Sequence, residues 1–331
     1  QNSIVNLYKL SPEKLLKMRC FMKIGIVGYG NLGRAAEINA KNLGYEITGI
    51  FSRRNVTSPF KTKVFDFKNF GSFDTETDIM LLCGGSKTNL REQSRIVAKR
   101  FNTADTFDTH AEIAEHIKEL DDIQQKRRGV SITAAGWDPG IFSVARVAFC
   151  AFLFEEPYTI WGRGASQGHG EAVRSISGVK NAVQYTVPKD GIVDMILSGE
   201  KPLNTPENLH TREVYVVKED GADEKEIENK IKNTEYYFKG YETSVRFIDE
   251  NEFEKNHKSL AHGGRVAATS SGAKLDFSIA LQSNPDFTAK ILLTYARAAV
   301  KMNKDGVIGA LSVLDVPPKY LCHDDDFLRF L

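Results

Sequence analysis

Near the start of the chain, GYGNLG at residues 28–33 has the glycine spacing of a loop that binds a pyrophosphate. A β-branched, strand-like run precedes these residues, and an amphipathic helical stretch, Ala35–Leu43, follows them. Gly28 would permit a tight turn, Gly30 would let the backbone approach the phosphates, and Gly33 would let helix and strand pack closely. The free N–H groups at the helix start favour an anion there. The pattern predicts a dinucleotide site formed by Gly28, Tyr29, Gly30, Asn31, Leu32 and Gly33.

The second strand-like run indicates which dinucleotide this site takes. Glu46–Phe51 ends in Ser52, Arg53 and Arg54, where NAD-binding versions of the motif carry an acidic side chain for the ribose hydroxyls. A carboxylate would repel a 2′-phosphate, whereas arginine holds one through charge-assisted hydrogen bonds. The sequence therefore favours NADP over NAD. The alternative is that the arginines are solvated side chains at a strand end.

Two aspartates follow later strand-like runs, Asp108 in DTFDTH and Asp138 in GWDPGIF. Ligands of parallel sheets bind beyond the carboxyl ends of the strands, so both carboxylates are predicted where a nicotinamide would project. Two carboxylates there would suit a cationic amine substrate. The alternatives are a helix N-cap for Asp108 and turn formation for Asp138. A third loop, CGGSKTN, is expected beside the cofactor and supplies Cys83, Gly85, Ser86 and Thr88.

These loops require a sheet whose strands alternate with helices, which is typical of a doubly wound α/β fold of the Rossmann type. The predicted helices that separate the later strands cover residues 90–101 and 110–126. The predicted strands are Lys23–Val27, Glu46–Phe51, Lys63–Phe67, Ile79–Cys83, Thr103–Thr106 and Ser131–Ala134.

After about residue 140 the pattern changes to that of an α+β domain with a second sheet. Its predicted strands are Thr159–Trp161, Ala182–Thr186, Arg212–Val217 and Tyr241–Ile248, with helices near 171–174 and 225–232 and a surface loop at 203–211. A final helix is expected at Thr288–Met302. We predict an NADP-binding domain at 22–137, completed by 303–331, and a substrate-binding and dimerisation domain at 138–302. Residues 1–21 are expected to be an extension outside the fold.

The composition excludes several classes of protein. The 331 residues carry a net charge of +1, which gives no field that would gather nucleic acid, and no apolar run reaches the roughly 20 residues of a membrane-spanning helix. The four cysteines lie far apart, without the spacing of a metal site or a disulfide scaffold. We expect a cytoplasmic protein with no metal site.

The chain closely resembles the meso-diaminopimelate dehydrogenase family. The matching blocks extend from Lys23 to about Leu314, and GWDPG together with SQGH is far more specific than the glycine turn. The other matching blocks are IVGYGNLGR, GIFSRR, DTFDTH, WGRGASQGH, GVKNAVQYT, AHGG and NPDFTA. The resemblance implies an NADP-dependent homodimeric enzyme of lysine biosynthesis. Its reaction would be the reversible oxidative deamination of meso-2,6-diaminopimelate at the D-centre, giving L-2-amino-6-oxopimelate and ammonia.

The resemblance also implies roles for particular residues. Asp108 and Asp138 would hold the amine at the reacting centre, with Trp137 and Trp161 bounding that end. The middle of the cleft and the distal L-centre would be contacted by Gln167, Gly168, Thr186, Arg212, His262 and Asn284. Taken without the resemblance, the tryptophans would be core residues, Arg212 a surface ion-pair partner and His262 a turn residue.

Two other functions stay open from the sequence. One is a dehydrogenase of broader D-amino acids with a loosened distal site, and the other is a non-catalytic regulator that binds NADP. Lys87 and Glu171 depart from the family pattern, and because Glu171 is expected at the substrate cleft, substrate tolerance is the property that this departure puts in question.

Overall fold

The computed structural model describes residues 22–331 except 74–75, 236, 259–260 and 323–326. The predicted extension at residues 1–21 lies outside this part of the chain. The chain divides into two compact units, and each is described by itself. The first unit holds the residues up to Gly140 together with Thr288–Leu331, and the second unit holds Ile141–Phe287.

The first unit is built on a seven-stranded parallel sheet with the order β14-β6-β5-β4-β1-β2-β3. Its central strands are fully buried apolar runs, as expected of a sheet that is covered on both faces. The strands are β1 (Lys23–Val27), β2 (Glu46–Ser52), β3 (Val64–Asp66), β4 (Ile79–Leu82), β5 (Asn102–Asp105), β6 (Val130–Thr133) and β14 (Gly309–Ser312).

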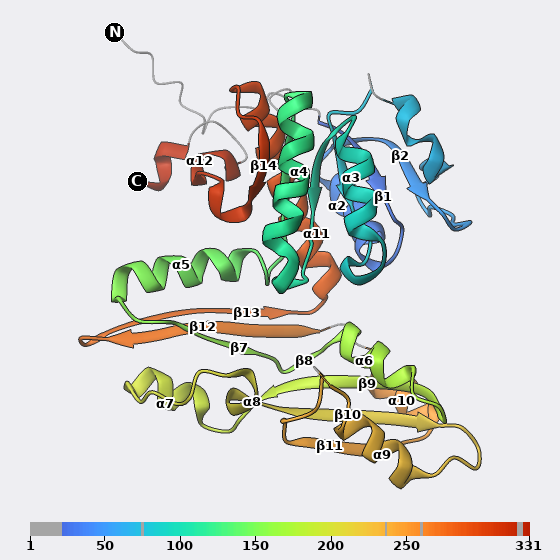
Figure 1. Ribbon diagram of the computed structural model, residues 1–331, viewed down its shortest axis with the longest axis vertical. Helices are drawn as coiled ribbons and strands as arrows, with labels where there is room; N and C mark the ends of the chain where they lie inside the picture. The colour runs from blue at the N-terminus through green and yellow to red at the C-terminus, as the bar shows by residue number, and fades with distance from the viewer. Residues whose placement is uncertain (1–21, 74–75, 236, 259–260, 323–326) are drawn as a thin grey trace. The chain divides into compact units, whose positions relative to one another are not determined.

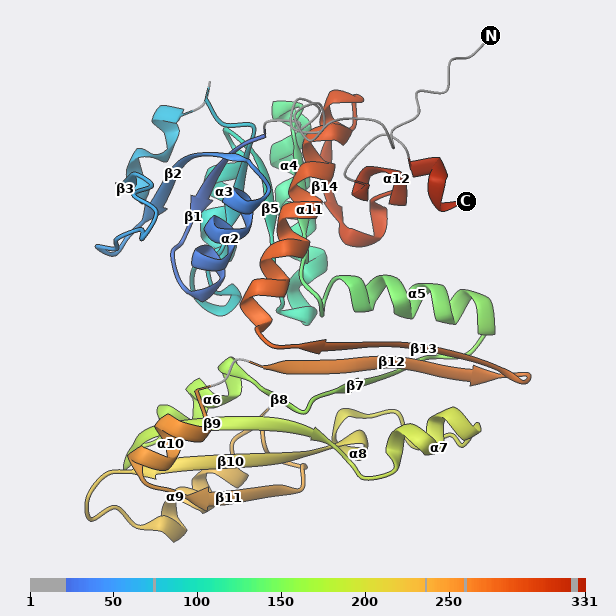
Figure 2. The ribbon, with the colours of Figure 1, turned by 180° about the vertical axis from the view of Figure 1, so that it is seen from behind.

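Helices pack on both faces of this sheet. In Figure 1, α3 (Arg91–Ala98) and α4 (Ile113–Arg127) lie on the near face of the sheet, and Figure 2 shows α2 (Asn31–Asn42) and α11 (Asn284–Lys304) on the other face. The helices that follow β1 and β4 therefore lie on opposite faces, although the two strands are neighbours. This is the switch point at which doubly wound sheets bind ligands, so the fold places a crevice beyond the carboxyl ends of β1 and β4.

The second unit contains two sheets. The four-stranded sheet has the order β11-β10-β9-β8 and the three-stranded sheet has the order β13-β12-β7. All neighbouring pairs are antiparallel except β10 with β11, which run parallel. The strands are β7 (Tyr158–Trp161), β8 (Gly164–Ala165), β9 (Val179–Pro188), β10 (His210–Lys218), β11 (Thr243–Phe247), β12 (His262–Ser270) and β13 (Ala273–Leu281).

Helices pack against both sheets of the second unit. Helix α5 (Ile141–Leu153) packs on β12 and β13, and α9 (Glu224–Lys232) buries Ile227 and Ile231 in a core with Val214 and Val216 of β10. The shorter helices are α6 (Gln167–Arg174), α7 (Ile192–Ser198), α8 (Pro206–Leu209) and α10 (Glu250–Asn256). The predicted combination of a Rossmann-type domain with a second α+β domain is confirmed.

Among the differences from the sequence predictions, three concern the second domain and its boundary. The predicted surface loop at 203–211 contains α8 and the first residues of β10, and Leu209 and His210 are buried. The hairpin of β12 and β13 was not predicted, because its alternation of small and polar residues gives little hydrophobic signal. Residues 288–302, predicted for the second domain, belong to the first unit, where Arg297 of α11 donates to the Leu321 carbonyl at 2.7 Å.

Candidate functional site

The glycine turn after β1 has the geometry that its sequence predicts. Gly28 has a φ of +87°, a conformation that side chains disfavour, and its N–H donates to the Phe51 carbonyl at 2.9 Å. A Cβ at Gly33 would lie 2.2 Å from the Gly28 carbonyl oxygen, so only glycine lets α2 pack this closely on the turn. At Gly30, the N-cap of α2, a Cβ would meet no described atom within 4 Å. The space beside Gly30 is therefore open to a ligand.

A cavity of about 420 Å³ lies over this turn. Its walls come from the ends of β1, β2 and β4 and from α3, and they include Gly28, Tyr29, Gly30, Ser52, Arg53, Arg54, Cys83, Gly84, Gly85, Asn89 and Gln93. The Gln93 side chain is buried, and its Oε1 has no hydrogen-bond partner among the described residues. A buried amide oxygen without a partner is costly, so this wall fits a polar ligand.

The electrostatics of this cavity match an anion. Neither guanidinium of the exposed Arg53 and Arg54 forms an ion pair with a described carboxylate, and the first turn of α2 carries no acidic residue. Ser52 Oγ accepts the Arg54 N–H at 3.1 Å, which orders the start of this arginine loop. The pattern of donors therefore fits the phosphates of NADP.

Most of the predicted cofactor residues fall into two groups. Gly28, Tyr29, Gly30, Ser52, Arg53, Arg54, Cys83 and Gly85 line the cavity, whereas Asn31, Leu32 and Gly33 form the first turn of α2. Ser86 is not part of the cavity lining, and its Oγ accepts the Asp108 backbone N–H. Gly84 and Asn89 belong to the CGGSKTN loop that was expected beside the cofactor, although neither was named as a contact. Gln93 was missed, since only the folded α3 turns it toward the glycine turn. The side chain of Thr88 lies outside the described part of the structure.

Two members of the cavity wall have strongly shifted acidities. Complete burial raises the pKa of the Cys83 thiol to about 12, so Cys83 is a neutral packing residue rather than a nucleophile. Burial and a hydrogen bond to the Glu37 carboxylate raise the pKa of Tyr29 to about 12. Both side chains therefore present uncharged surfaces to the cavity.

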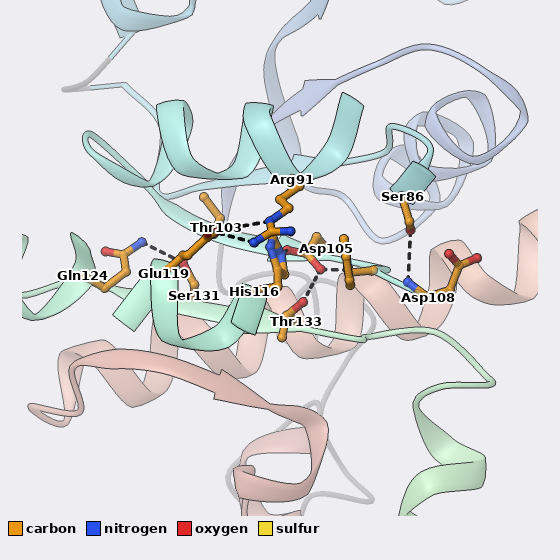
Figure 3. Close-up of polar contacts among 11 residues, drawn as sticks. Ser86, Arg91, Thr103, Asp105, Asp108, His116, Glu119, Gln124, Ser131 and Thr133 are labelled. Carbon is orange, nitrogen blue, oxygen red and sulfur yellow. Dashed lines mark hydrogen bonds and ion pairs between the residues drawn. The ribbon is translucent and has the colours of Figure 1, made fainter. Parts of the chain in front are cut away.

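Asp108 and Asp138 lie beyond the carboxyl ends of the neighbouring strands β5 and β6, as predicted. Asp108 is exposed and its backbone N–H donates to Ser86 Oγ at 3.0 Å, which joins its loop to the loop after β4 (Figure 3). Thr109, and not Asp108, is the N-cap of the turn that begins at His110, so the capping alternative for Asp108 is wrong. Asp138 is half-buried in the turn from Gly136 to Gly140, and its bond to Pro139 is cis.

In the second unit, Thr186 and Arg212 are directly opposite each other on β9 and β10. Arg212 is 7% exposed, its Nη1 donates to Thr186 Oγ1, and its guanidinium lies 4.1 Å from the centre of the Tyr241 ring. Burial lowers the pKa of Arg212. Its Nε has no partner among the described residues, and none of their carboxylates forms an ion pair with it. The surface ion-pair alternative for Arg212 is therefore wrong, and the geometry fits a carboxylate ligand.

His262 begins β12 and lies against the same segment of chain as Thr186. A Cβ at Gly164 would lie 2.3 Å from the His262 ring, and a Cβ at Gly162 would lie 2.1 Å from the Thr186 carbonyl oxygen. The two glycines thus let the WGRG segment pass between these residues and gather Thr186, Arg212 and His262, here named the clamp cluster. His262 is a strand residue and not a turn residue, and burial lowers its pKa, which favours a neutral ring.

The two tryptophans have different surroundings. Trp137, in the first unit, is 8% exposed, whereas Trp161 is half-buried and stacks on His210 at 5.2 Å between ring centroids. The backbone N–H of Trp161 donates to His210 Nε2 at 2.8 Å, so His210 Nδ1 carries the proton that it shares with the Pro206 carbonyl. Burial lowers the pKa of His210 to about 4 and keeps the ring neutral. Sequence reasoning missed His210, because no motif marks it.

The three remaining predicted substrate contacts lie at the starts of helices α6 and α11. Gly168 is exposed in the first turn of α6, and Asn284 is the half-buried first residue of α11. Gln167 starts α6, but its side chain lies outside the described part of the structure. Among the described residues no three histidine, cysteine, aspartate or glutamate side chains gather as metal ligands, and none of the helices is both long and apolar enough to span a bilayer.

Together, the parallel sheet, the phosphate-binding turn and the arginines after β2 define a dinucleotide-dependent dehydrogenase class with a separate α+β domain. Residues 136–283 match the family model of the diaminopimelic acid dehydrogenase C-terminal domain. The meso-diaminopimelate D-dehydrogenase of Lysinibacillus sphaericus is 45% identical over 89% of this chain and 94% of that protein. The chain belongs to the meso-diaminopimelate D-dehydrogenase family.

Two solved structures are also similar over nearly their full length. Diaminopimelate dehydrogenase of Corynebacterium glutamicum in complex with diaminopimelate is 39% identical, with a TM-score of 0.87, over 93% of this chain and 98% of that one. An engineered D-amino acid dehydrogenase bound to NADP⁺ is 37% identical, with a TM-score of 0.83 and the same coverage.

Proposed function

We propose that this chain catalyses the NADP-dependent, reversible oxidative deamination of meso-2,6-diaminopimelate at its D-centre. The products are L-2-amino-6-oxopimelate, ammonium, NADPH and a proton, and one water molecule is consumed. The observation that carries the proposal is the 39% identity, over almost the whole chain, to an enzyme of known structure in complex with diaminopimelate. The cofactor assignment is supported by the relative bound to NADP⁺ and by the paired arginines after β2.

The first unit would hold the cofactor. The N–H groups of the glycine turn would hold its pyrophosphate, and Ser52, Arg53 and Arg54 would hold its 2′-phosphate. When bound, the nicotinamide accepts a hydride from the substrate carbon. The protein's part is to orient that carbon and to move the protons.

Asp108 and Asp138 would hold the ammonium group of the D-centre. Both carboxylates follow the ends of parallel strands at the same edge of the sheet, and opposite charge favours the amine over a neutral or anionic group there. Loss of a hydride and one proton from the ammonium form would leave a protonated imine, and water would attack its carbon while one of the carboxylates accepts the water proton. The resulting carbinolamine expels ammonia and leaves the keto acid.

The clamp cluster would hold the carboxylate at the distal L-centre. The buried guanidinium of Arg212 has an unused Nε–H, and Thr186 and the neutral His262 add polar contacts around it. An inverted or truncated substrate would leave these buried groups without a partner, which costs several kilocalories per mole. The clamp cluster therefore supports a choice between two chemically similar carbons. Trp137, Trp161, Gln167, Gly168 and Asn284 are proposed as further substrate contacts.

We also propose a homodimer that works in the cytoplasm, where thiols stay reduced. The support for self-association is helix α5, which is almost entirely apolar and exposes 42% of Val144, 54% of Val147 and 72% of Phe152. An apolar surface of this kind is typical of an obligate interface. Light scattering of the purified chain tests this, and a monomeric mass at micromolar concentration would contradict it.

The reaction itself is tested by following the absorbance of reduced nicotinamide. The chain is mixed with NADP and, separately, with meso-, L,L- and D,D-diaminopimelate and simple D-amino acids. We expect reduction with the meso isomer alone. Comparable rates with simple D-amino acids would indicate an open distal site, and binding of NADP without any reduction would indicate a regulator.

The role of the carboxylates is tested by Asp138→Asn. Because the amide can neither pair with the ammonium group nor accept a proton, turnover should fall at least about a hundredfold. The dissociation constant for NADPH, measured by fluorescence titration, should change less than about twofold. A loss confined to NADPH binding would assign Asp138 to the cofactor instead.

A further inference from the structure

The aspartate that ends β5, Asp105, is fully buried and lies three residues before Asp108. We propose that Asp105, together with His116 of α4, is a positioning residue that sets the geometry of both carboxylate loops. The inference rests on the proposed function, because it requires that Asp108 and Asp138 act on the substrate.

The Asp105 carboxylate joins three separate elements (Figure 3). Its Oδ1 accepts the Phe107 N–H at 3.0 Å and the Thr133 hydroxyl at 2.5 Å. Its Oδ2 lies 3.1 Å from His116 Nε2. The Phe107 contact fixes the turn that leads into Asp108, and the Thr133 contact fixes the end of β6, from which the chain continues to Asp138.

The backbone of Asp105 joins the same two loops a second time. Its carbonyl accepts the Ala135 N–H at 2.8 Å, beyond the last residue of β6. Asp105 therefore holds the loop after its own strand through Phe107 and the loop after the neighbouring strand through Thr133 and Ala135. One residue thus sets the spacing between the chain segments that carry the two proposed catalytic carboxylates.

His116 locks this arrangement from the helix. Its ring is fully buried and stacks on Phe107 with 4.2 Å between centroids. Because a carboxylate only accepts hydrogen bonds, His116 Nε2 carries the proton in the contact with Asp105. His116 therefore holds the Asp105 carboxylate by hydrogen bonding and the Phe107 ring by packing, so the base of the Asp108 loop is fixed on two sides.

Asp105 joins these elements through a charged group, although neutral groups join them elsewhere. Two residues earlier on the same strand, Thr103 and Ser131 join β5 to β6 through their hydroxyls at 2.6 Å, and Gln124 of α4 donates to Ser131 at 2.8 Å (Figure 3). Neutral groups are thus sufficient to join these elements. A buried carboxylate is more costly, but it accepts several hydrogen bonds at once and each is stronger than a neutral one. Asp105 ends β5, where the loop to Asp108 begins. Rigidity at this position matters for catalysis because it fixes the loops that carry the two carboxylates.

The test measures steady-state kinetics for Asp105→Ala and His116→Leu, with Asp105→Asn as the conservative variant. Misplacing a reacting group by about 1 Å costs up to about a hundredfold, so we expect kcat to fall about ten- to a hundredfold for Asp105→Ala and His116→Leu. The KM for NADP should stay within about twofold. Asp105→Asn keeps the acceptor for Phe107 and Thr133 and should regain most of kcat.

Thr103→Val is the matched control, because Thr103 is equally buried on the same strand and its hydroxyl is paired with Ser131 inside β6. It should lower the thermal midpoint and leave kcat within about twofold. In an Asp138→Asn background, Asp105→Ala should cost less than it does alone, since it acts through the carboxylates.

These measurements distinguish a failure of the positioning role from a failure of the proposed function. If the unaltered chain does not oxidise meso-diaminopimelate, the proposed function fails and takes the inference with it. If the unaltered chain is active but Asp105→Ala and His116→Leu lose no more kcat than Thr103→Val, the function stands and the positioning role is overturned. Should Asp105→Ala fail to fold, His116→Leu decides the question alone.

Discussion

The cofactor cavity of the first unit and the clamp cluster of the second unit receive negative charge in different ways. The cavity uses backbone N–H groups, glycines and two exposed arginines, all beyond strand ends. The clamp cluster uses a buried guanidinium that donates to Thr186 on the next strand, while His262 begins a strand of a different sheet. An exposed arginine is solvated by water when no ligand is bound, so the empty site costs little free energy. A buried arginine with an unused Nε–H is destabilised until it binds a carboxylate. The clamp cluster should therefore be the more selective site and the cavity the more tolerant one.

The largest effect is expected from Arg212→Leu. Removing the buried cation should raise the KM for meso-diaminopimelate at least about a hundredfold, which corresponds to about 3 kcal/mol. The KM for NADP should change little, since the cavity lies in the other unit. Initial rates over a range of both substrates measure this. Equal increases in the two KM values would show that the two regions are not separate sites.

The glycines of the turn allow a sharper comparison within the first unit. Gly33→Ala places a Cβ 2.2 Å from the Gly28 carbonyl oxygen, so it should destabilise the unit by about 1–3 kcal/mol and weaken NADP binding at least tenfold. Gly30→Ala meets no described atom within 4 Å and should weaken NADP binding without lowering the melting temperature. Calorimetry and cofactor titration distinguish the two. A loss of stability in Gly30→Ala would mean that the space beside it is not a ligand space.

The buried histidine beside Trp161 makes the second unit sensitive to acid. Its pKa is lowered from 6.5 to about 4 by burial, so the unfolded chain binds the proton more tightly and stability is lost as the pH falls from 6.5 toward 4. At pH 5 this histidine should cost about 2 kcal/mol of the stability present at pH 7. Urea unfolding of the unaltered chain and of His210→Gln at both pH values measures the difference. An identical pH dependence in the two proteins would contradict it.

The smallest effect is expected at the exposed arginines of the cavity. Arg53→Ala and Arg54→Ala should each weaken NADP binding about tenfold, or about 1.4 kcal/mol, because surface charge pairs are partly screened by water. Binding of NAD, which lacks the 2′-phosphate, should be unaffected. Titration with both dinucleotides at two salt concentrations gives the ratio. A parallel loss of NAD binding would mean that the arginines shape the cavity rather than select the phosphate.

The two regions also differ in how far they could be predicted. The glycine turn is local: strand, turn and helix are consecutive, so spacing alone predicted Gly28, Gly30 and Gly33 correctly as the turn. Asp108 and Asp138 could be assigned to one edge because parallel strands end together. Neither prediction needed the position of any distant residue. The acidity of Cys83, by contrast, depends on burial that only the packed sheet provides.

The clamp cluster could be named only through a resemblance to a family. Thr186 and Arg212 are 26 residues apart and meet because β9 and β10 pair in one particular register, while His262 arrives from another sheet. A shift of one residue would turn every side chain of a strand to the other face. His210, Gln93 and Asp105 were missed for the same reason, since each has its role through partners that are distant in sequence.

By itself the sequence determined the consecutive features of this protein: the alternation of strands and helices, the phosphate-binding turn, the arginines that favour NADP and the strand ends that carry Asp108 and Asp138. These follow from local periodicity and from the conformational freedom of glycine. Only the tertiary structure decided which polar groups are buried and what they contact. It placed Thr186 opposite Arg212, stacked Trp161 on His210 and packed the final helix into the first unit. It also placed Asp105 where it holds two loops. Burial and partnership arise from contacts between distant segments, and those contacts exist only once the strands have paired and the helices have packed.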